Sequence, residues 1–227
     1  MKNKKIPVPK IDWKKIETVM LDMDGTLLDK HFDDYFWEEH VPEVYARENK
    51  LNFWSAYETL MAKYKSREGT LDWTNINYWS DQLKLDLAGM KEKMSHLIQV
   101  HPYVIDFLKF CMSKKKQIHL VTNAHSKTLA IKMAKTEIES YFDRIICSED
   151  IGLPKEDPSF WDRLAEKTGF KKESAILADD NEAVLASAKQ YGMEHLIFVA
   201  KSSSMKPVGY SAYYPSIIFF SELMEEE

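Results

Sequence analysis

The 227-residue sequence has few cysteines and no long apolar run, and both absences narrow the classes of protein it can belong to. The two cysteines, Cys111 and Cys147, stand in apolar surroundings, and neither belongs to a C-x-x-C pair. This pattern argues against a disulfide framework or a metal–thiolate site, and it predicts buried thiols in a reducing compartment. No apolar run approaches the ~20 residues that span a bilayer, and no signal-peptide core follows the basic N-terminus. We therefore expect a cytoplasmic protein without a membrane partner.

An excess of positive charge is also missing. Lys and Arg number 31 against 36 Asp and Glu, which gives a formal net charge of −5. Binding to a nucleic-acid polymer depends on basic side chains that neutralise phosphates, so no such partner is expected. The length fits one large domain, or a core domain with a smaller insert. Either a monomer or a homodimer is compatible with these bulk properties.

Short apolar runs alternate with amphipathic stretches over most of the chain. This alternation predicts an α/β fold with a Rossmann-like parallel sheet and helices on both of its faces. The ligand crevice of such a sheet lies at the carboxyl ends of its strands. The predicted strands are 19–21, 117–122, 144–147, 175–178, 195–199 and 217–220, and the predicted helices are 103–112, 126–137, 158–168 and 182–191.

The stretch 32–100 interrupts this alternation. It is rich in aromatic residues, contains no convincing strand, and has helical apolar spacing at 56–64 and 90–98. Pro42 predicts a break or kink in the stretch 33–49. We predict a core domain made of residues 1–31 and 101–227, with residues 32–100 inserted as a helical cap domain that covers the crevice.

Two carboxylates follow the first predicted strand directly. Asp22 and Asp24 are separated by Met23 and followed by Gly25 and Thr26, which let the backbone turn. Because residues i and i+2 of an extended chain point to the same side, both acids can face one reaction centre. One could attack a substrate while the other handles a proton. The alternative is an acidic turn that merely ends a strand.

Further polar groups follow the other strands. Thr122 and Asn123 offer a hydroxyl and an amide beside a helix start, where backbone N–H groups can bind a phosphate oxygen. Lys155 lies in a loop stiffened by Gly152 and Pro154, which can hold its ammonium group as a fixed charge.

Charge balance at this edge of the sheet predicts a cation. The fourth segment supplies Asp179 and Asp180, so Asp22, Asp24 and Asp180 would crowd three carboxylates around the single charge of Lys155. Like charges this close disfavour joint ionisation. Mg²⁺ would resolve the repulsion, since it prefers carboxylate, carbonyl, water and phosphate oxygens, and it can polarise a phosphoryl group.

These four segments, in this order and context, resemble the motifs of the haloacid dehalogenase-like (HAD) hydrolase superfamily. The matching segments are Asp22 to Thr26, Val121 to Asn123, Lys155, and Leu177 to Asp180, and the insert resembles a C1-type cap. Within the superfamily, segments 11–13, 27–33, 68–73, 122–125 and 152–158 resemble the bacterial GMP/IMP 5′-nucleotidase subfamily.

The resemblance implies a role for each of these residues. Asp22 would be the nucleophile that forms an aspartyl-phosphate, and Asp24 the general acid and then the base. Thr122 would bind the transferring phosphoryl group, and Lys155 would neutralise it together with Asp22. The implied Mg²⁺ ligands are Asp22, the backbone carbonyl of Asp24, and Asp180. Many relatives have glycine at the position of Asp179, so this residue could act on the metal through water or hold Lys155. They also have proline at the position of Glu156.

The resemblance implies a Mg²⁺-dependent phosphomonoesterase whose small-molecule substrate is a purine nucleoside 5′-monophosphate, GMP or IMP. Three alternatives remain at this point: a phosphatase of another small phosphomonoester, a sugar phosphomutase on the same fold, and a non-catalytic phosphate-binding module. The last has no use for a nucleophile and an acid together.

Substrate-binding candidates outside the four segments come from the insert. Lys63 and Arg67 lie one turn apart on a predicted helix and could meet phosphate or base edges, although a solvated helix face fits as well. Trp73 could stack on a purine or simply belong to the core of the cap. Asn123 is the remaining candidate for substrate contact. His125 is interpreted as a polar residue at a helix start.

Overall fold

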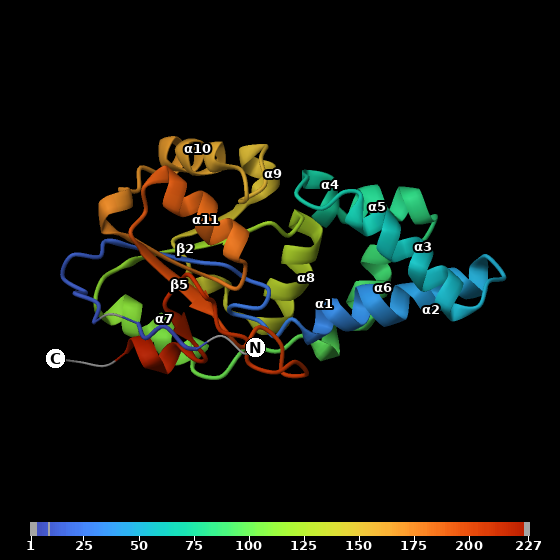
Figure 1. Cartoon of the computed structure of the whole chain (residues 1–227), viewed down its shortest axis with the longest axis horizontal. Coiled ribbons are helices and arrows are strands. Elements are labelled where there is room, and N and C mark those ends of the chain that lie inside the picture. The colour runs from blue at the N-terminus through green and yellow to red at the C-terminus, as the bar shows by residue number, and fades with distance from the viewer. Residues whose placement is uncertain (1–3, 9, 225–227) are drawn as a thin grey trace.

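A six-stranded parallel sheet forms the centre of the larger part of the molecule (Figure 1). The structure is a computed structural model that describes residues 4–8 and 10–224. The strands lie in the order β3-β2-β1-β4-β5-β6, and every neighbouring pair is parallel. Their bounds are β1 Thr18–Leu21, β2 Gln117–Thr122, β3 Arg144–Cys147, β4 Ala175–Asp179, β5 His195–Val199 and β6 Ser216–Ile217. β1 is central, so its carboxyl end lies between those of β2 and β4.

Both faces of the sheet are covered because the strands carry apolar side chains on both sides. Along β1, Val19 and Leu21 pack into one core while Met20 packs into another. Helix α7 (Val104–Ser113) covers the first face, and α10 (Pro158–Thr168) and α11 (Glu182–Tyr191) cover the second. This arrangement confirms the prediction of an α/β fold with helices on both faces. The remaining core helices are α8 (Ser126–Thr136) and α9 (Ser148–Ile151), and short 3₁₀ turns occur at Glu139–Tyr141 and Lys172–Ser174.

The last strand is shorter than predicted. The sequence predicts a strand over 217–220, but β6 ends at Ile217, and a 3₁₀ turn runs from Phe220 to Leu223. Glu222 explains the early end, since its carboxylate accepts hydrogen bonds from the backbone N–H groups of Ile218 (2.6 Å) and Phe219 (3.2 Å). These N–H groups therefore bond to a side chain rather than to a neighbouring strand.

A helical segment is inserted between β1 and β2, and it contains no β-strand from residue 31 to residue 97. Figure 1 shows it as a group of helices to one side of the sheet, with α8 between the two parts. Its helices are α1 His31–Tyr35, a π-helical segment Phe36–His40, α2 Val41–Glu48, α3 Phe53–Lys65, α4 Leu71–Thr74, α5 Ile76–Leu83 and α6 Leu87–Lys93, followed by a 3₁₀ turn Ser95–Leu97. This is the insert of a C1-type cap. The division at residues 31/32 and 100/101 stays a prediction.

Two sequence expectations within the cap differ from the structure. The chain does not break at Pro42, since the backbone stays right-handed helical at Phe36 and Val41. The regular α-helix is instead interrupted upstream, by the π-helical segment Phe36–His40, which ends two residues before the proline. Pro42 then occupies the first turn of α2, where a missing N–H costs least. The single helix expected at 90–98 is divided, because Met94 leaves the helical conformation between α6 and the 3₁₀ turn.

Other features agree with the bulk sequence properties. Cys111 and Cys147 are both buried free thiols, and burial raises the pKa of each to about 12. Within residues 4–8 and 10–224, every helix is too short or too polar to cross a bilayer.

Candidate active site

A cavity of about 690 Å³ lies between the carboxyl ends of the strands and the cap. The sequence predicts seven site residues in the core domain, and all of them line this cavity: Asp22, Asp24, Thr122, Asn123, Lys155, Asp179 and Asp180. From the cap, Trp73 lines the cavity, whereas Lys63 and Arg67 do not. The Arg67 guanidinium instead lies over the ring of Tyr78, 5.4 Å from its centroid.

The turn after β1 places the first two carboxylates in the cavity. Met23 is fully buried on the other side, as the alternation of an extended chain requires. Gly25 has φ +86°, and a Cβ atom there would lie 2.3 Å from Asp180 Oδ2. Both the left-handed backbone and the close approach of Asp180 therefore require glycine. The turn closes with a hydrogen bond from the Gly25 N–H to the Leu28 carbonyl (2.8 Å).

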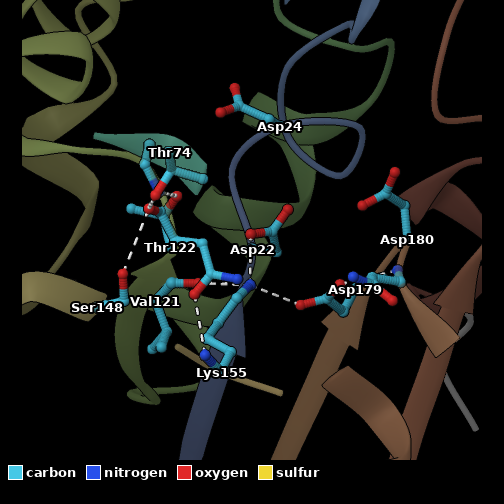
Figure 2. Close-up of polar contacts among 12 residues, drawn as sticks. Asp22, Asp24, Thr74, Val121, Thr122, Ser148, Lys155, Asp179 and Asp180 are labelled. Carbon is cyan, nitrogen blue, oxygen red and sulfur yellow. Dashed lines mark hydrogen bonds and ion pairs between the residues drawn. The ribbon is translucent and has the colours of Figure 1, made fainter. Parts of the chain in front are cut away.

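The side chain of Lys155 joins the ends of three strands (Figure 2). Its Nζ donates to Asp22 Oδ1 (2.6 Å), Asp179 Oδ2 (2.7 Å) and the Val121 carbonyl (3.1 Å). The lysine is only 2% exposed. Burial alone would lower the pKa of Lys155, because it disfavours the charged ammonium group. The negative charges of Asp179 and Asp22 together have the larger effect, so the pKa of Lys155 is raised. A fixed positive charge thus lies directly beside Asp22.

Asp179 contacts Lys155 and also belongs to a cluster of carboxylates. Its carboxylate holds Lys155, and its Oδ1 accepts the N–H of Asn181 (2.9 Å). One oxygen each from Asp22, Asp179 and Asp180 lies within 4.8 Å of the others. Three clustered carboxylates of this kind fit a hard divalent cation such as Mg²⁺. Asp180 pairs in addition with Lys30 at 3.0 Å, which sequence reasoning had not singled out.

The loop after β2 is tied to the Lys155 loop. Asn123 accepts the backbone N–H of Lys155 through its Oδ1 (2.9 Å) and donates through its Nδ2 to Glu156 (2.9 Å). Glu156 also accepts from Asn181 (3.2 Å), so the glutamate that stands in place of proline connects three loops. The side-chain amide of Asn123 therefore links the loop after β2 to the loop that carries Lys155 and Glu156. Thr122 is buried, and its Oγ1 accepts the N–H of Ala124 (3.0 Å).

A second buried lysine holds Asp24. Lys132 of α8 donates to Asp24 Oδ1 (2.5 Å) and to Asp33 Oδ2 (2.5 Å), and Lys91 of α6 donates to Asp33 Oδ1 (2.5 Å). Both lysines are 1% exposed. Lys91 also lies over the ring of Phe36 at 4.7 Å. Asp24 is thus connected through Lys132 and Asp33 to two helices of the cap.

This network perturbs its two acids in opposite directions. Burial raises the pKa of Asp24 to about 6, against the attraction of Lys132. Asp33 is buried too, but it faces two ammonium groups. Their attraction outweighs desolvation and holds the pKa of Asp33 well below its ordinary value. Asp24 therefore holds its proton to a higher pH than an ordinary aspartic acid, which is the direction that suits a general acid.

Sequence reasoning missed Lys132, Asp33 and Lys91. One signal was present: Lys132 follows Leu129 by three residues and precedes Met133, so it lies on the apolar side of its helix. A lysine at such a position needs a carboxylate partner. No comparable sequence pattern identifies which carboxylate that is, because Asp33 belongs to the cap.

A second set of contacts between cap and core joins Thr74 and Asn77 to the segment 123–127. Thr74 Oγ1 donates to the Asn123 carbonyl (2.5 Å), in the loop that follows Thr122 (Figure 2). Asn77 lies 3.1 Å from His125 Nε2 and accepts from Lys127 (2.7 Å). His125 caps the start of α8, where its Nδ1 accepts the Lys127 N–H (3.2 Å). The interpretation of His125 as a helix-start residue is therefore confirmed.

A parallel α/β sheet that presents paired aspartates, a lysine and a carboxylate cluster beneath a helical cap defines a class of phosphatase. The chain belongs to the haloacid dehalogenase-like hydrolases, whose family profile matches residues 16–192. It is an enzyme of this family.

Individual relatives agree with this membership. The chain is 38% identical to the GMP/IMP nucleotidase YrfG of Escherichia coli (strain K12) over 194 residues, which are 86% of this chain and 87% of that protein. It is 24% identical to a phosphorylated carbohydrates phosphatase of Thermotoga maritima, over 82% of this chain and 87% of the other. Its fold is similar to that of a HAD phosphatase from Thermococcus onnurineus, with a TM-score of 0.77, 23% identity, and coverage of 92% and 96% of the two chains.

Proposed function

We propose that this chain hydrolyses purine nucleoside 5′-monophosphates, GMP and IMP, to the nucleoside and inorganic phosphate with Mg²⁺ as cofactor. The observation that carries the chemistry is the placement of Asp22 and Asp24 in one cavity, each beside its own buried lysine. The 38% identity to a GMP/IMP nucleotidase supports the substrate class.

The first half of the reaction transfers the phosphoryl group to the protein. A carboxylate oxygen of Asp22 attacks phosphorus, the bond between phosphorus and the nucleoside 5′ oxygen breaks, and Asp24 gives its proton to that oxygen. Lys155 and the hydroxyl and loop N–H groups at Thr122 face the charge on the phosphoryl oxygens. Asp179 keeps the Lys155 ammonium group in place.

The second half releases phosphate. A water molecule gives a proton to Asp24 and attacks phosphorus, the bond to the Asp22 oxygen breaks, and the carboxylate is restored. Asp22, Asp180 and the backbone carbonyl of Asp24 would hold Mg²⁺, which neutralises phosphoryl oxygens when bound. The cap, residues 32–100 in our proposal, would exclude bulk water from the aspartyl-phosphate.

Phosphate release from a substrate panel tests the proposal. The panel contains GMP, IMP, AMP, CMP, ribose 5-phosphate and glucose 1-phosphate, each with Mg²⁺ and with EDTA. We expect the highest kcat/KM with GMP and IMP and loss of activity in EDTA. Absence of turnover with every nucleotide would contradict the proposal. Isomerised sugar phosphate without free phosphate would favour a phosphomutase instead.

A further inference from the structure

The lysines that line the cavity differ in how many of their N–H groups remain free for a ligand. An ammonium group carries three N–H donors. Lys155 uses all three of them, because Asp22, Asp179 and the Val121 carbonyl each accept one. Lys155 therefore acts on a bound anion through its charge, and it has no N–H group left for a phosphate oxygen.

Two other lysines of the cavity are no better placed for this contact. Lys91 is 1% exposed and donates to a buried carboxylate of the cap network. Lys65 is exposed, but it belongs to α3 of the cap and donates to Glu68. A free cationic donor on the core side of the cavity must therefore come from another residue.

Lys30 lines the core side of the cavity and has donors to spare. Its Nζ donates to Asp180 Oδ2 (3.0 Å), and it has no second acceptor among the described residues. The side chain is 40% exposed, so the other two N–H groups can reach a ligand. Partial burial would lower the pKa of Lys30, but the charges of Asp180, Asp22 and Asp34 together have the larger effect and raise it. The ammonium group therefore keeps its charge.

The main chain of Lys30 is held at the junction of core and cap. Its N–H donates to the Ser202 carbonyl (3.0 Å). The preceding residue, Asp29, is buried, and its carboxylate accepts the N–H of Ser204 (2.9 Å) in the same loop. The base of the lysine side chain is thus fixed, while its charged end is open to the cavity.

The order of the strands places Lys30 across the nucleophile from Thr122. Strand β1 lies between β2 and β4, and Figure 2 shows Thr122 and Asp180 on opposite sides of Asp22. The Thr122 hydroxyl accepts the N–H of Ala124 and still has its own O–H to donate. A group bound over Asp22 would meet that O–H on one side and the free N–H groups of Lys30 on the other. A phosphate fits, since it is an anion with several acceptor oxygens.

We propose that Lys30 binds the phosphate group of the substrate, through the N–H groups that its pair with Asp180 leaves free. This assignment rests on the proposed phosphatase function, but not on the identity of the base. Lys30 would touch the phosphate oxygens and take no part in proton transfer. The two lysines would then divide the work: Lys155 holds Asp22 and supplies charge, and Lys30 supplies both charge and hydrogen bonds.

Binding of inorganic phosphate tests this assignment, because phosphate carries the group that Lys30 would contact. Titration calorimetry on protein saturated with Mg²⁺ measures its affinity. We expect Lys30→Met to weaken phosphate binding roughly 10-fold, the effect of one charge-assisted hydrogen bond. Lys30→Arg keeps the charge and the donors and should restore most of the affinity. KM for GMP should rise by a similar factor in Lys30→Met, with a smaller change in kcat.

The matched control is Lys206→Met. Lys206 also forms an ion pair with an aspartate, Asp34 (2.7 Å), and its side chain is 52% exposed, but it does not line the cavity. Its removal should leave phosphate affinity at the wild-type value. If Lys30→Met also bound phosphate as the wild type does, or if the wild type bound none, the assignment would be overturned.

A second titration separates phosphate binding from a role as counter-ion of Asp180. Mg²⁺ is added to each protein without phosphate. Loss of the Lys30 charge beside a proposed metal ligand should leave Mg²⁺ affinity equal or higher. Weaker Mg²⁺ binding in proportion to the loss of phosphate affinity would show that Lys30 only positions Asp180, and would overturn the proposal. Neither titration needs turnover, so the expected results would support a phosphate contact even if no nucleotide were hydrolysed.

Discussion

Two buried lysines organise the candidate active site, and they differ in what they connect. Lys155 bonds to Asp22, Asp179 and the Val121 carbonyl. All three partners lie at the carboxyl ends of adjacent strands of one sheet. The register of that sheet therefore fixes the Lys155 cluster, whatever the position of the cap.

Lys132 connects the core to the cap instead. It bonds to Asp24 on the core side and to Asp33 of α1, which in turn bonds to Lys91 of α6. The position of Asp24, the proposed acid–base residue, is thus coupled to cap contacts, while that of Asp22, the proposed nucleophile, is not. In the proposed reaction, the sheet alone would organise phosphoryl transfer, whereas protonation of the leaving group would also depend on the cap.

The largest effect is expected for Asp22→Asn, at the centre of the Lys155 cluster. The amide cannot attack phosphorus, so kcat for GMP should fall by at least about 10⁴-fold, as for other catalytic nucleophiles. Phosphate release measures this loss, and thermal unfolding serves as the folding control. Activity above about one hundredth of the wild type would show that Asp22 is not the nucleophile.

Lys155→Met should come next. The change removes the cation beside the phosphoryl group and leaves Asp22 and Asp179 buried together. We expect a loss of about 10²- to 10³-fold in kcat, accompanied by lower stability. The loss should be similar for GMP and for p-nitrophenyl phosphate, because Lys155 acts on the phosphoryl group that both substrates share. A loss confined to GMP would contradict this role.

Lys132→Met should give the opposite substrate dependence. Without Lys132, Asp24 loses the partner that positions it, and we expect kcat for GMP to fall about 10- to 100-fold, part of the usual contribution of a general acid. p-Nitrophenolate leaves without protonation, so kcat for p-nitrophenyl phosphate should fall much less. The ratio of the two kcat values, measured for both lysine variants, is the sharpest test of the comparison. An equal ratio for the two variants would contradict the assignment of phosphoryl transfer to the Lys155 cluster and of leaving-group protonation to the Lys132 cluster.

The same comparison explains what the sequence could and could not predict. Asp22, Asp179 and Asp180 follow predicted strands, and parallel strands bring their carboxyl ends to one edge, so local pattern suffices to assemble them. The partner of Lys132 is different, because Asp33 reaches α8 only through the packing of an inserted helical segment. Periodicity shows that Lys132 faces an apolar interior, but it does not specify which cap helix lies opposite.

Two errors have the same origin in contacts between distant segments. The strand expected at 217–220 ends early because Glu222 takes the N–H groups of Ile218 and Phe219. The sequence predicts Lys63 and Arg67 on one helix, but α3 ends at Lys65, before Arg67. The helix presents Met61, Tyr64 and Lys65 to the cavity instead of Lys63. Charge and spacing identify the face of a helix, but tertiary packing decides which face meets the ligand.

The smallest effect is expected for Asp33→Asn, and it concerns stability. Lys91 and Lys132 donate to different oxygens of Asp33. Asn has only one acceptor oxygen, so it can keep the hydrogen bond from one lysine, and it neutralises neither of them. The free energy of unfolding should therefore fall by about 1–3 kcal/mol at neutral pH. Since the folded-state pKa of Asp33 lies below its ordinary value of 3.8, the ionised carboxylate stabilises the fold fully above that pH. This contribution is lost as pH falls from there toward the folded-state pKa.

The difference between wild type and Asp33→Asn should therefore be full at neutral pH and smaller near pH ~3, as measured by urea unfolding. Glu17→Gln is the control, because Glu17 pairs with Lys171 at 3.6 Å on the exposed surface and such pairs contribute little. A pH-independent difference, or one no larger than that of the control, would show that Asp33 does not carry its charge against Lys132 and Lys91. Asp24 would then be the only acid balancing Lys132, and the cap would have no electrostatic connection to the general acid.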